Sequence, residues 1–225
     1  PHTLYISPLK ALAVDIARNL EAPVAEMGLP ITVETRTGDT PVNRRQRQKR
    51  IPPDILLTTP EQVALLLADR QADRLFSELE VVVLDELHAL VTSKRGDLLS
   101  LGIAGLRRHA PNLRTVGLSA TVADPEGLRA WLVPQTDPDV PAMAEVVEVS
   151  GGARPDIRII DAADRIPWAG HSARWALPAV YEAIKAHKTT LVFVNTRSQA
   201  EMLFHELWRI NEDTLAIALH HGSLD

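Results

Sequence analysis

The chain has 225 residues, of which 45% are hydrophobic and 24% are charged, and its net charge is −5. This composition indicates a globular protein of one large or two smaller domains, and it excludes a chain-wide basic surface, so any nucleic-acid site must be a local patch. The lack of cysteine excludes disulfides and cysteine-ligated metal sites and fits the reducing cytoplasm. No apolar run approaches the roughly 20 residues that cross a membrane, and no signal peptide is visible.

Apolar strands alternate with amphipathic helices along the first part of the chain, which predicts a parallel α/β sheet with flanking helices. Strands are expected at residues 3–6, 31–36, 54–57, 80–84 and 114–118. Helices are expected at residues 10–27, 41–51, 61–68, 72–79, 97–109 and 125–132. Thr40 and Asp124, each followed by a proline, are the expected N-caps of two of these helices.

The composition changes at Pro134, where three prolines and two acidic residues within eight positions favour an extended linker. We therefore expect a first domain at residues 1–133, a linker at 134–144 and a second α/β domain at 145–225. In the second domain, strands are expected at residues 145–149, 190–194 and 214–219, and helices at 174–187 and 197–210.

The strand at residues 80–84 runs directly into two acidic residues, Asp85 and Glu86, and His88 follows. In an open parallel sheet, chemistry collects just past the carboxyl ends of the strands. A carboxylate at Asp85 can hold a hydrated Mg²⁺ beside nucleotide phosphates, and Glu86 is placed to orient or deprotonate a water molecule. The structural alternative is an acidic helix N-terminus, where carboxylates favour the helix dipole.

Small or polar clusters also end the other predicted strands, and the remaining motifs decide between these alternatives. The clusters are Ser7-Pro8-Leu9-Lys10, Thr58-Thr59-Pro60-Glu61, Ser119-Ala120-Thr121, Asn195-Thr196 and His220-His221-Gly222. In this order they resemble the motif series of superfamily 2 DExH-box helicases, over essentially the whole chain. The segments 36–41, 53–61 and 167–171 narrow the resemblance to the large-helicase-related group, and most of all to its ligase-associated bacterial branch.

This resemblance implies two RecA-like domains and an enzyme that uses ATP and Mg²⁺ to move along single-stranded or partly duplex DNA. It also implies a 3′ to 5′ direction, a role in DNA repair, and a repair ligase or nuclease as a partner. No Gly-x-x-x-x-Gly-Lys-Ser/Thr loop occurs in the sequence, and the arginine motif of the family would follow the last residue. The chain also starts without a methionine and looks like a piece of a longer protein, and because these two motifs are missing we expect it to be inactive.

The roles of individual residues follow from the same resemblance. Asp85, Glu86 and His88 are the expected catalytic residues, with Asp85 as the metal ligand, and Ser119, Ala120 and Thr121 are expected to couple ATP hydrolysis to DNA movement. His88 is expected to hydrogen-bond to Ser119 or Thr121. The expected DNA-binding residues are Ser7, Pro8, Lys10, Arg36, Gly38, Asp39, Thr59, Pro60, Glu61, Asn195, Thr196, His221 and Gly222.

Several alternatives remain open in the sequence. Asn195 and Thr196 could simply cap the helix that follows them, although a helix N-terminus is itself an anion site. The basic run at residues 44–50 fits a solvated helix face as well as it fits phosphate contacts. The whole protein could also act on RNA or an RNA–DNA hybrid, or serve as a nucleic-acid-binding or scaffold module without turnover.

Overall fold

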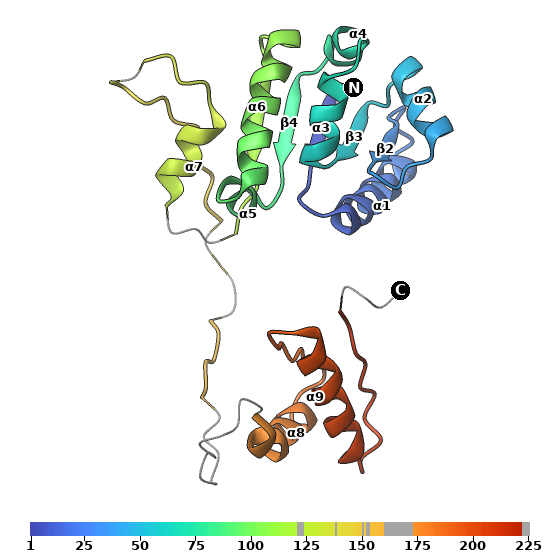
Figure 1. Ribbon diagram of the computed structural model, residues 1–225, viewed down its shortest axis with the longest axis vertical. Helices are drawn as coiled ribbons and strands as arrows, with labels where there is room; N and C mark the ends of the chain where they lie inside the picture. Colours follow the sequence, from blue (N-terminus) through green and yellow to red (C-terminus); the bar gives the residue numbers. More distant parts are fainter. Residues whose placement is uncertain (121–123, 138, 150, 152–153, 160–172, 222–225) are drawn as a thin grey trace. The chain divides into compact units, whose positions relative to one another are not determined.

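The computed structural model describes residues 1–120, 124–137, 139–149, 151, 154–159 and 173–221. The chain divides into two compact units, Pro1–Val149 and Ser150–Asp225 (Figure 1). In the described part of the chain, no helix is long and apolar enough to cross a membrane. The expected division into a domain at 1–133, a linker and a domain from 145 stays a prediction.

The first unit is built on a five-stranded sheet in which all paired strands are parallel. In spatial order its strands are β2 (Val33–Arg36), β3 (Ile55–Thr58), β1 (Thr3–Ile6), β4 (Val81–Leu84) and β5 (Arg114–Gly117). The register places Ile6 opposite both Thr58 and Leu84. The carboxyl ends of the strands are therefore level, and the loops that follow them share one edge of the sheet.

Helices pack on both faces of this sheet (Figure 1). They are α1 (Lys10–Glu26), α2 (Val42–Arg50), α3 (Pro60–Leu67), α4 (Ala72–Phe76), α5 (Leu87–Val91), α6 (Lys94–His109) and α7 (Pro125–Leu132). Alternate strand side chains point to opposite faces. Leu4 and Ile6 of β1 thus join the main core with α3 and α6, whereas Tyr5 packs with Ala13 and Ala17 of α1.

The α/β architecture agrees with the prediction from sequence, and the strands of this unit lie within two residues of their expected positions. Asp124 caps α7 as expected, because its side chain accepts a hydrogen bond from the Gly127 amide at 2.9 Å. Thr40 does not cap α2. Its hydroxyl instead accepts from the Thr37 amide at 2.9 Å, and α2 starts after Pro41, so the threonine stabilises the preceding turn.

The second unit contains a short 3-10 helix (Ala173–Ala176), α8 (Leu177–Lys185) and α9 (Arg197–Arg209). Leu177 and Tyr181 of α8 pack against Leu207 of α9. The strands expected at residues 145–149, 190–194 and 214–219 are absent from the described residues. A strand exists only where its N–H and C=O groups pair with a neighbouring strand, and these segments have no such partner in the described part of the chain.

Candidate active site at the carboxyl edge of the sheet

Asp85 and Glu86 lie where β4 ends, and the backbone there takes an unusual conformation. The Asp85 amide donates to the carbonyl of Ile6 at 2.9 Å, which extends the strand pairing by one residue. The next amide, that of Glu86, donates to Oδ1 of Asp85 at 3.0 Å. Glu86 is left-handed, with φ of 49° and ψ of 44°, which costs an L-residue about 1–2 kcal/mol. Such strain at a strand end is typical of functional sites.

His88 connects the acidic pair to the end of β5. Its Nδ1 lies 2.9 Å from the hydroxyl of Ser119, and its Nε2 lies 3.2 Å from Oε2 of Glu86. A neutral imidazole that donates from Nε2 to the carboxylate can accept at Nδ1 from the hydroxyl. The expected contact between His88 and Ser119 is therefore present, and its coupling role stays a prediction. Ala120 follows on the same edge, and Thr121 lies outside the described residues.

Tyr5 is a neighbour of Asp85 that the functional motifs did not identify. Burial, together with the negative charge of Asp85 and a hydrogen bond to it, raises the pKa of the Tyr5 phenol to about 12. Strand register is the signal that would have found it. Tyr5 pairs with Val83, two residues before Asp85, and side chains two apart on a strand share one face.

The donor set at this edge fits a magnesium ion that is held mainly by water and phosphate. The described residues contain no group of three or more acidic or histidine side chains that could form an all-protein metal site. Mg²⁺ commonly takes one or two protein carboxylates and completes its octahedron with water and substrate phosphates. Asp85 can supply such a carboxylate at the end of β4.

The loops after β1 and β2 meet through an ion pair between two of the expected DNA-binding residues. The Lys10 ammonium lies 3.0 Å from Oδ1 and 2.9 Å from Oδ2 of Asp39. Gly38 lies beside this lysine, because a Cβ there would be in ordinary contact with its Nζ at 3.4 Å. Ser7 is fully buried, and its hydroxyl has no hydrogen-bond partner among the described residues. Lys10 is an exposed cation at this edge, paired with Asp39.

Other expected DNA-binding residues are buried at the ends of β2 and β3. The Arg36 guanidinium donates to the carbonyl of Arg45 at 3.1 Å. Burial and then the nearby Arg45 charge lower the pKa of Arg36. Thr59 and Pro60 are also buried, and the Thr59 carbonyl accepts from the start of α3. These residues shape the edge, and their contacts with DNA stay predictions.

Glu61, on the first turn of α3, is held by a residue that the sequence did not single out. Arg95 donates to both carboxylate oxygens of Glu61, from Nε at 2.6 Å and from Nη2 at 3.1 Å. Its Nη1 donates to the carbonyl of Pro8 at 2.9 Å. Arg95 therefore connects the loop after β1 to the loop after β3.

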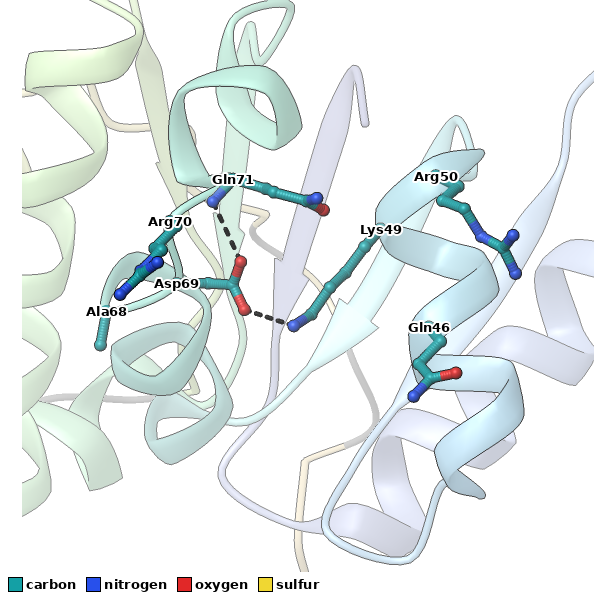
Figure 2. Close-up of a pocket in the computed structure, with 7 residues that line it drawn as sticks. All are labelled: Gln46, Lys49, Arg50, Ala68, Asp69, Arg70 and Gln71. Atoms are coloured by element: carbon teal, nitrogen blue, oxygen red, sulfur yellow. Dashed lines mark hydrogen bonds and ion pairs between the residues drawn. The ribbon is translucent and has the colours of Figure 1, made fainter.

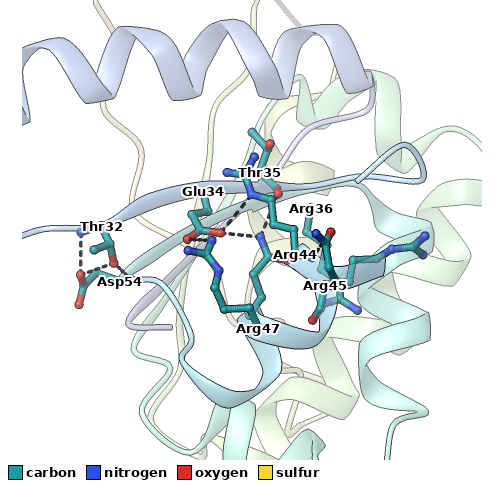
Figure 3. Close-up of polar contacts among 10 residues, drawn as sticks. Thr32, Glu34, Thr35, Arg36, Arg44, Arg45, Arg47 and Asp54 are labelled. Carbon is teal, nitrogen blue, oxygen red and sulfur yellow. Dashed lines mark hydrogen bonds and ion pairs between the residues drawn. The ribbon is translucent and has the colours of Figure 1, made fainter. Parts of the chain in front are cut away.

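The basic run on α2 is partly neutralised by one acidic residue of β2 (Figure 3). Arg44 Nε lies 3.4 Å and Arg47 Nη2 lies 2.5 Å from the Glu34 carboxylate, which Gln48 also contacts at 2.8 Å. Burial raises the pKa of the Glu34 carboxyl, but these hydrogen bonds and charges outweigh it, so the pKa lies below its ordinary value. Two of the arginines thus have a structural partner.

A shallow cleft of about 680 Å³ lies beside the C-terminal end of α2 (Figure 2). It is lined by Gln46, Lys49 and Arg50 of α2 and by residues 68–71, and an ion pair between Lys49 and Asp69 spans it. The end of α2 leads into β3, and residues 68–71 follow the end of α3. The cleft therefore belongs to the opposite edge of the sheet from Asp85.

In the second unit, the structure shows the capping role that the sequence left open for Thr196. Its hydroxyl accepts from the Gln199 amide at 3.2 Å at the start of α9, and Asn195 next to it is exposed. His221 Nε2 lies 3.3 Å from Oε1 of Glu201. Gly222 and the segment 167–171 lie outside the described residues.

Comparison with known proteins gives a consistent set of relatives. Residues 1–128 match the family model described as DEAD/DEAH box helicase. The chain is 35% identical to the ATP-dependent helicase Lhr-Core protein 2 of Thermococcus barophilus, a match that covers 99% of this chain and 27% of that protein. It is 38% identical to the Lhr helicase/probable uracil glycosylase of Mycolicibacterium smegmatis, with 97% of this chain and 15% of that protein covered.

Solved structures agree with these matches. The Mycobacterium smegmatis helicase Lhr bound to single-stranded DNA and AMP-PNP has a TM-score of 0.75 and 32% identity, over 100% of this chain and 31% of that one. The helicase MrfA bound to DNA and AMPPNP has a TM-score of 0.70 and 25% identity, over 92% of this chain and 29% of that one. This chain thus spans only 15% to 27% of the two curated relatives.

Proposed function

Because the chain belongs to the DEAD/DEAH box helicase family, with Lhr-type ATP-dependent helicases among its relatives, we propose that it serves an ATP-driven DNA motor. In this proposal the whole protein hydrolyses ATP and moves 3′ to 5′ along single-stranded DNA in the cytoplasm, as part of DNA repair. The DNA-bound structures of Lhr and MrfA support DNA as the substrate. The direction, the repair role, the ligase-associated branch and a partner ligase or nuclease rest on the sequence resemblance alone.

One observation carries the proposal: the strained Asp85–Glu86 pair shares its sheet edge with the loops predicted to hold DNA. We propose that Asp85 ligates Mg²⁺, which would neutralise charge on the nucleotide phosphates. Glu86 would orient or deprotonate the attacking water, with its carboxylate 3.2 Å from Nε2 of His88. His88 contacts both Glu86 and Ser119, so it would transmit a structural change at the acidic pair to the end of β5.

DNA would be held by contacts that read no base. Hydroxyls, backbone amides and the Lys10 cation grip phosphates of any sequence, as a motor requires. We propose that residues 145–225 begin a second RecA-like domain, joined by a linker at 134–144, whose Asn195, Thr196, His221 and Gly222 add to the DNA track. Because the 225 residues contain no Gly-x-x-x-x-Gly-Lys-Ser/Thr loop, this chain by itself should show negligible ATP hydrolysis.

The decisive experiment measures ATP hydrolysis by the full-length protein with and without single-stranded DNA, beside Glu86→Gln. The proposal predicts strong DNA stimulation in the native protein and its loss in the variant, with ATP binding retained. Equal, DNA-independent rates in both would favour a binding or scaffold module. Stimulation by RNA or by an RNA–DNA hybrid in preference to DNA, at one fixed salt concentration, would reassign the substrate.

A further inference from the structure

Arg95 occupies an unusual position at the start of α6, where one side chain joins three separate parts of the edge. It grips the Glu61 carboxylate with two parallel hydrogen bonds of 2.6 and 3.1 Å, and it donates to the Pro8 carbonyl at 2.9 Å. The two partners lie 34 and 87 residues away in sequence. A planar guanidinium can make these bonds at fixed angles, which a lysine ammonium cannot.

Both partners, Pro8 and Glu61, are among the expected DNA-binding residues. Pro8 lies between Ser7 and Lys10 in the loop after β1, and Glu61 lies two residues after Thr59 in the loop after β3. A carboxylate at Glu61 would repel a phosphate, but its charge is already matched by Arg95. Burial raises the pKa of this carboxyl and the Arg95 hydrogen bonds lower it by more, so Glu61 stays ionised well below neutral pH.

The short helix α5 lies between Arg95 and the acidic pair Asp85–Glu86 in the chain. This helix starts immediately after Glu86, and Leu87 and Leu90 on it are buried in the core. Gly96, in the first turn of α6, packs tightly against the end of α5. A Cβ there would fall 2.5 Å from the Leu90 carbonyl oxygen and 2.8 Å from that of Val91, and the Gly96 amide donates to Ser93 at 2.8 Å. This close contact is the path by which a shift of α5 would reach Arg95, the residue before Gly96.

We propose that Arg95 is a positioning residue that transmits the DNA-bound state of the loops after β1 and β3 to Asp85 and Glu86. This inference rests on the proposed function, because it assigns Arg95 to the coupling step of the same motor. In this inference Glu61 would anchor Arg95 through its carboxylate, in place of the direct DNA contact expected from the sequence. DNA that displaces the loop at Pro8 would change the hydrogen bond between the Pro8 carbonyl and Arg95. The resulting shift of Arg95 would be transmitted through α5 to Glu86.

The test compares Arg95→Gln and Arg95→Lys with Arg108→Gln in the full-length protein. Arg108 is an exposed arginine of the same helix with no hydrogen bond or ion pair to any described residue, so it is a matched control. ATP hydrolysis is measured with and without single-stranded DNA, and DNA affinity is measured separately by fluorescence anisotropy. We expect the ratio of stimulated to unstimulated rate to fall about tenfold in Arg95→Gln and nearly as far in Arg95→Lys. Arg108→Gln should keep the native ratio.

Glu61→Gln supplies a double-mutant cycle. If Arg95 acts through Glu61, the double variant should lose no more stimulation than Arg95→Gln alone, because the two changes remove one interaction. A fall in melting temperature and in both rates, with an unchanged ratio, would show a merely structural role and overturn the inference. So would native stimulation in Arg95→Gln. Absence of stimulation in the native protein would instead contradict the proposed function.

Discussion

Lys10 and Asp39 form a two-point ion pair across the edge of the sheet, with the ammonium 3.0 and 2.9 Å from the carboxylate oxygens. Lys10 follows β1 and Asp39 follows β2, and β3 lies between these two strands. Both side chains are more than half exposed, at 55% and 75%, so the pair contributes at most about 1 kcal/mol to stability. A phosphate group can therefore compete with Asp39 for the lysine.

Removal of the Asp39 charge should strengthen DNA binding. In Asp39→Asn, Lys10 no longer has a carboxylate partner, so one more cation is available to phosphate. We expect tighter binding of single-stranded DNA and a salt dependence of log Kd that is steeper by about 0.7 per added contact. Lys10→Gln should change both quantities in the opposite direction.

The control for this prediction is Asp15→Asn. It also removes a carboxylate from an exposed ion pair on α1, with Arg18 at 3.8 Å, but away from the sheet edge. Titrations of labelled DNA at several salt concentrations give both slopes. Equal gains in affinity from Asp39→Asn and Asp15→Asn would mean that only the net charge of the protein matters.

Glu86→Gly should make the protein more stable and inactive. Glycine adopts the left-handed backbone of residue 86 without the clash of a Cβ, so the free energy of unfolding should rise by about 1 kcal/mol. Glu86→Gln keeps the Cβ and should show no such gain, although both variants lose ATP hydrolysis. Chemical unfolding beside the rate assay tests this. Lower stability of Glu86→Gly would mean that the contact of Glu86 with His88 outweighs the strain.

Glu34 forms ion pairs with Arg44 and Arg47. Loss of the acidic charge and reversal of the basic charges should shift DNA binding in opposite directions. Glu34→Gln frees Arg44 and Arg47 of α2 and should steepen the salt dependence if this helix contacts phosphate. Charge reversal of Arg44, Arg45 and Arg47 should weaken binding and flatten that dependence, by about 0.7 for each lost contact. If neither variant changes the slope, the basic run of α2 is solvated surface. Circular dichroism would verify that the helix remains folded.

Asp54 should stabilise the fold in a pH-dependent way. Its carboxylate accepts from the amide and the hydroxyl of Thr32, both at 2.7 Å, just before β3. These hydrogen bonds, the amide first, hold the pKa of Asp54 below its ordinary value of 3.8. The stabilisation is thus fully present above about pH 4 and is lost as the pH falls through the lowered folded pKa.

Asp54→Asn should therefore cost about 1 kcal/mol at pH 7, a modest value because the group is largely exposed, and progressively less below pH 4. Urea unfolding of both proteins at pH 7 and pH 3 measures the difference. Asp15→Asn, which removes the same charge from an exposed ion pair on α1, is the control for the change in net charge. A constant difference between native protein and Asp54→Asn at both pH values would exclude the charge of Asp54 as the cause.

Local sequence patterns were sufficient to predict the strands of the sheet in the first unit. Continuous apolar runs such as 81–84 predict central strands covered on both faces, and in β4 Val82 and Leu84 are buried while Val81 and Val83 are half-buried. Local patterns were insufficient at residues 190–194 and 214–219, where the residue types favour strands. Those segments remain unpaired in the described structure, because strand formation depends on a neighbour and not on composition alone.

The sequence by itself determined the parallel α/β class and the order of the polar clusters at the strand ends. It also determined the resemblance of the Asp85–Glu86 motif to that of helicases. Only the tertiary structure showed that Lys10 is bound to Asp39, that Tyr5 faces Asp85 and that Arg95 joins Pro8 to Glu61. The physical reason is that apolar periodicity is a local property of the chain. Pairing between polar side chains depends on strand order and register, which bring together residues far apart in the sequence.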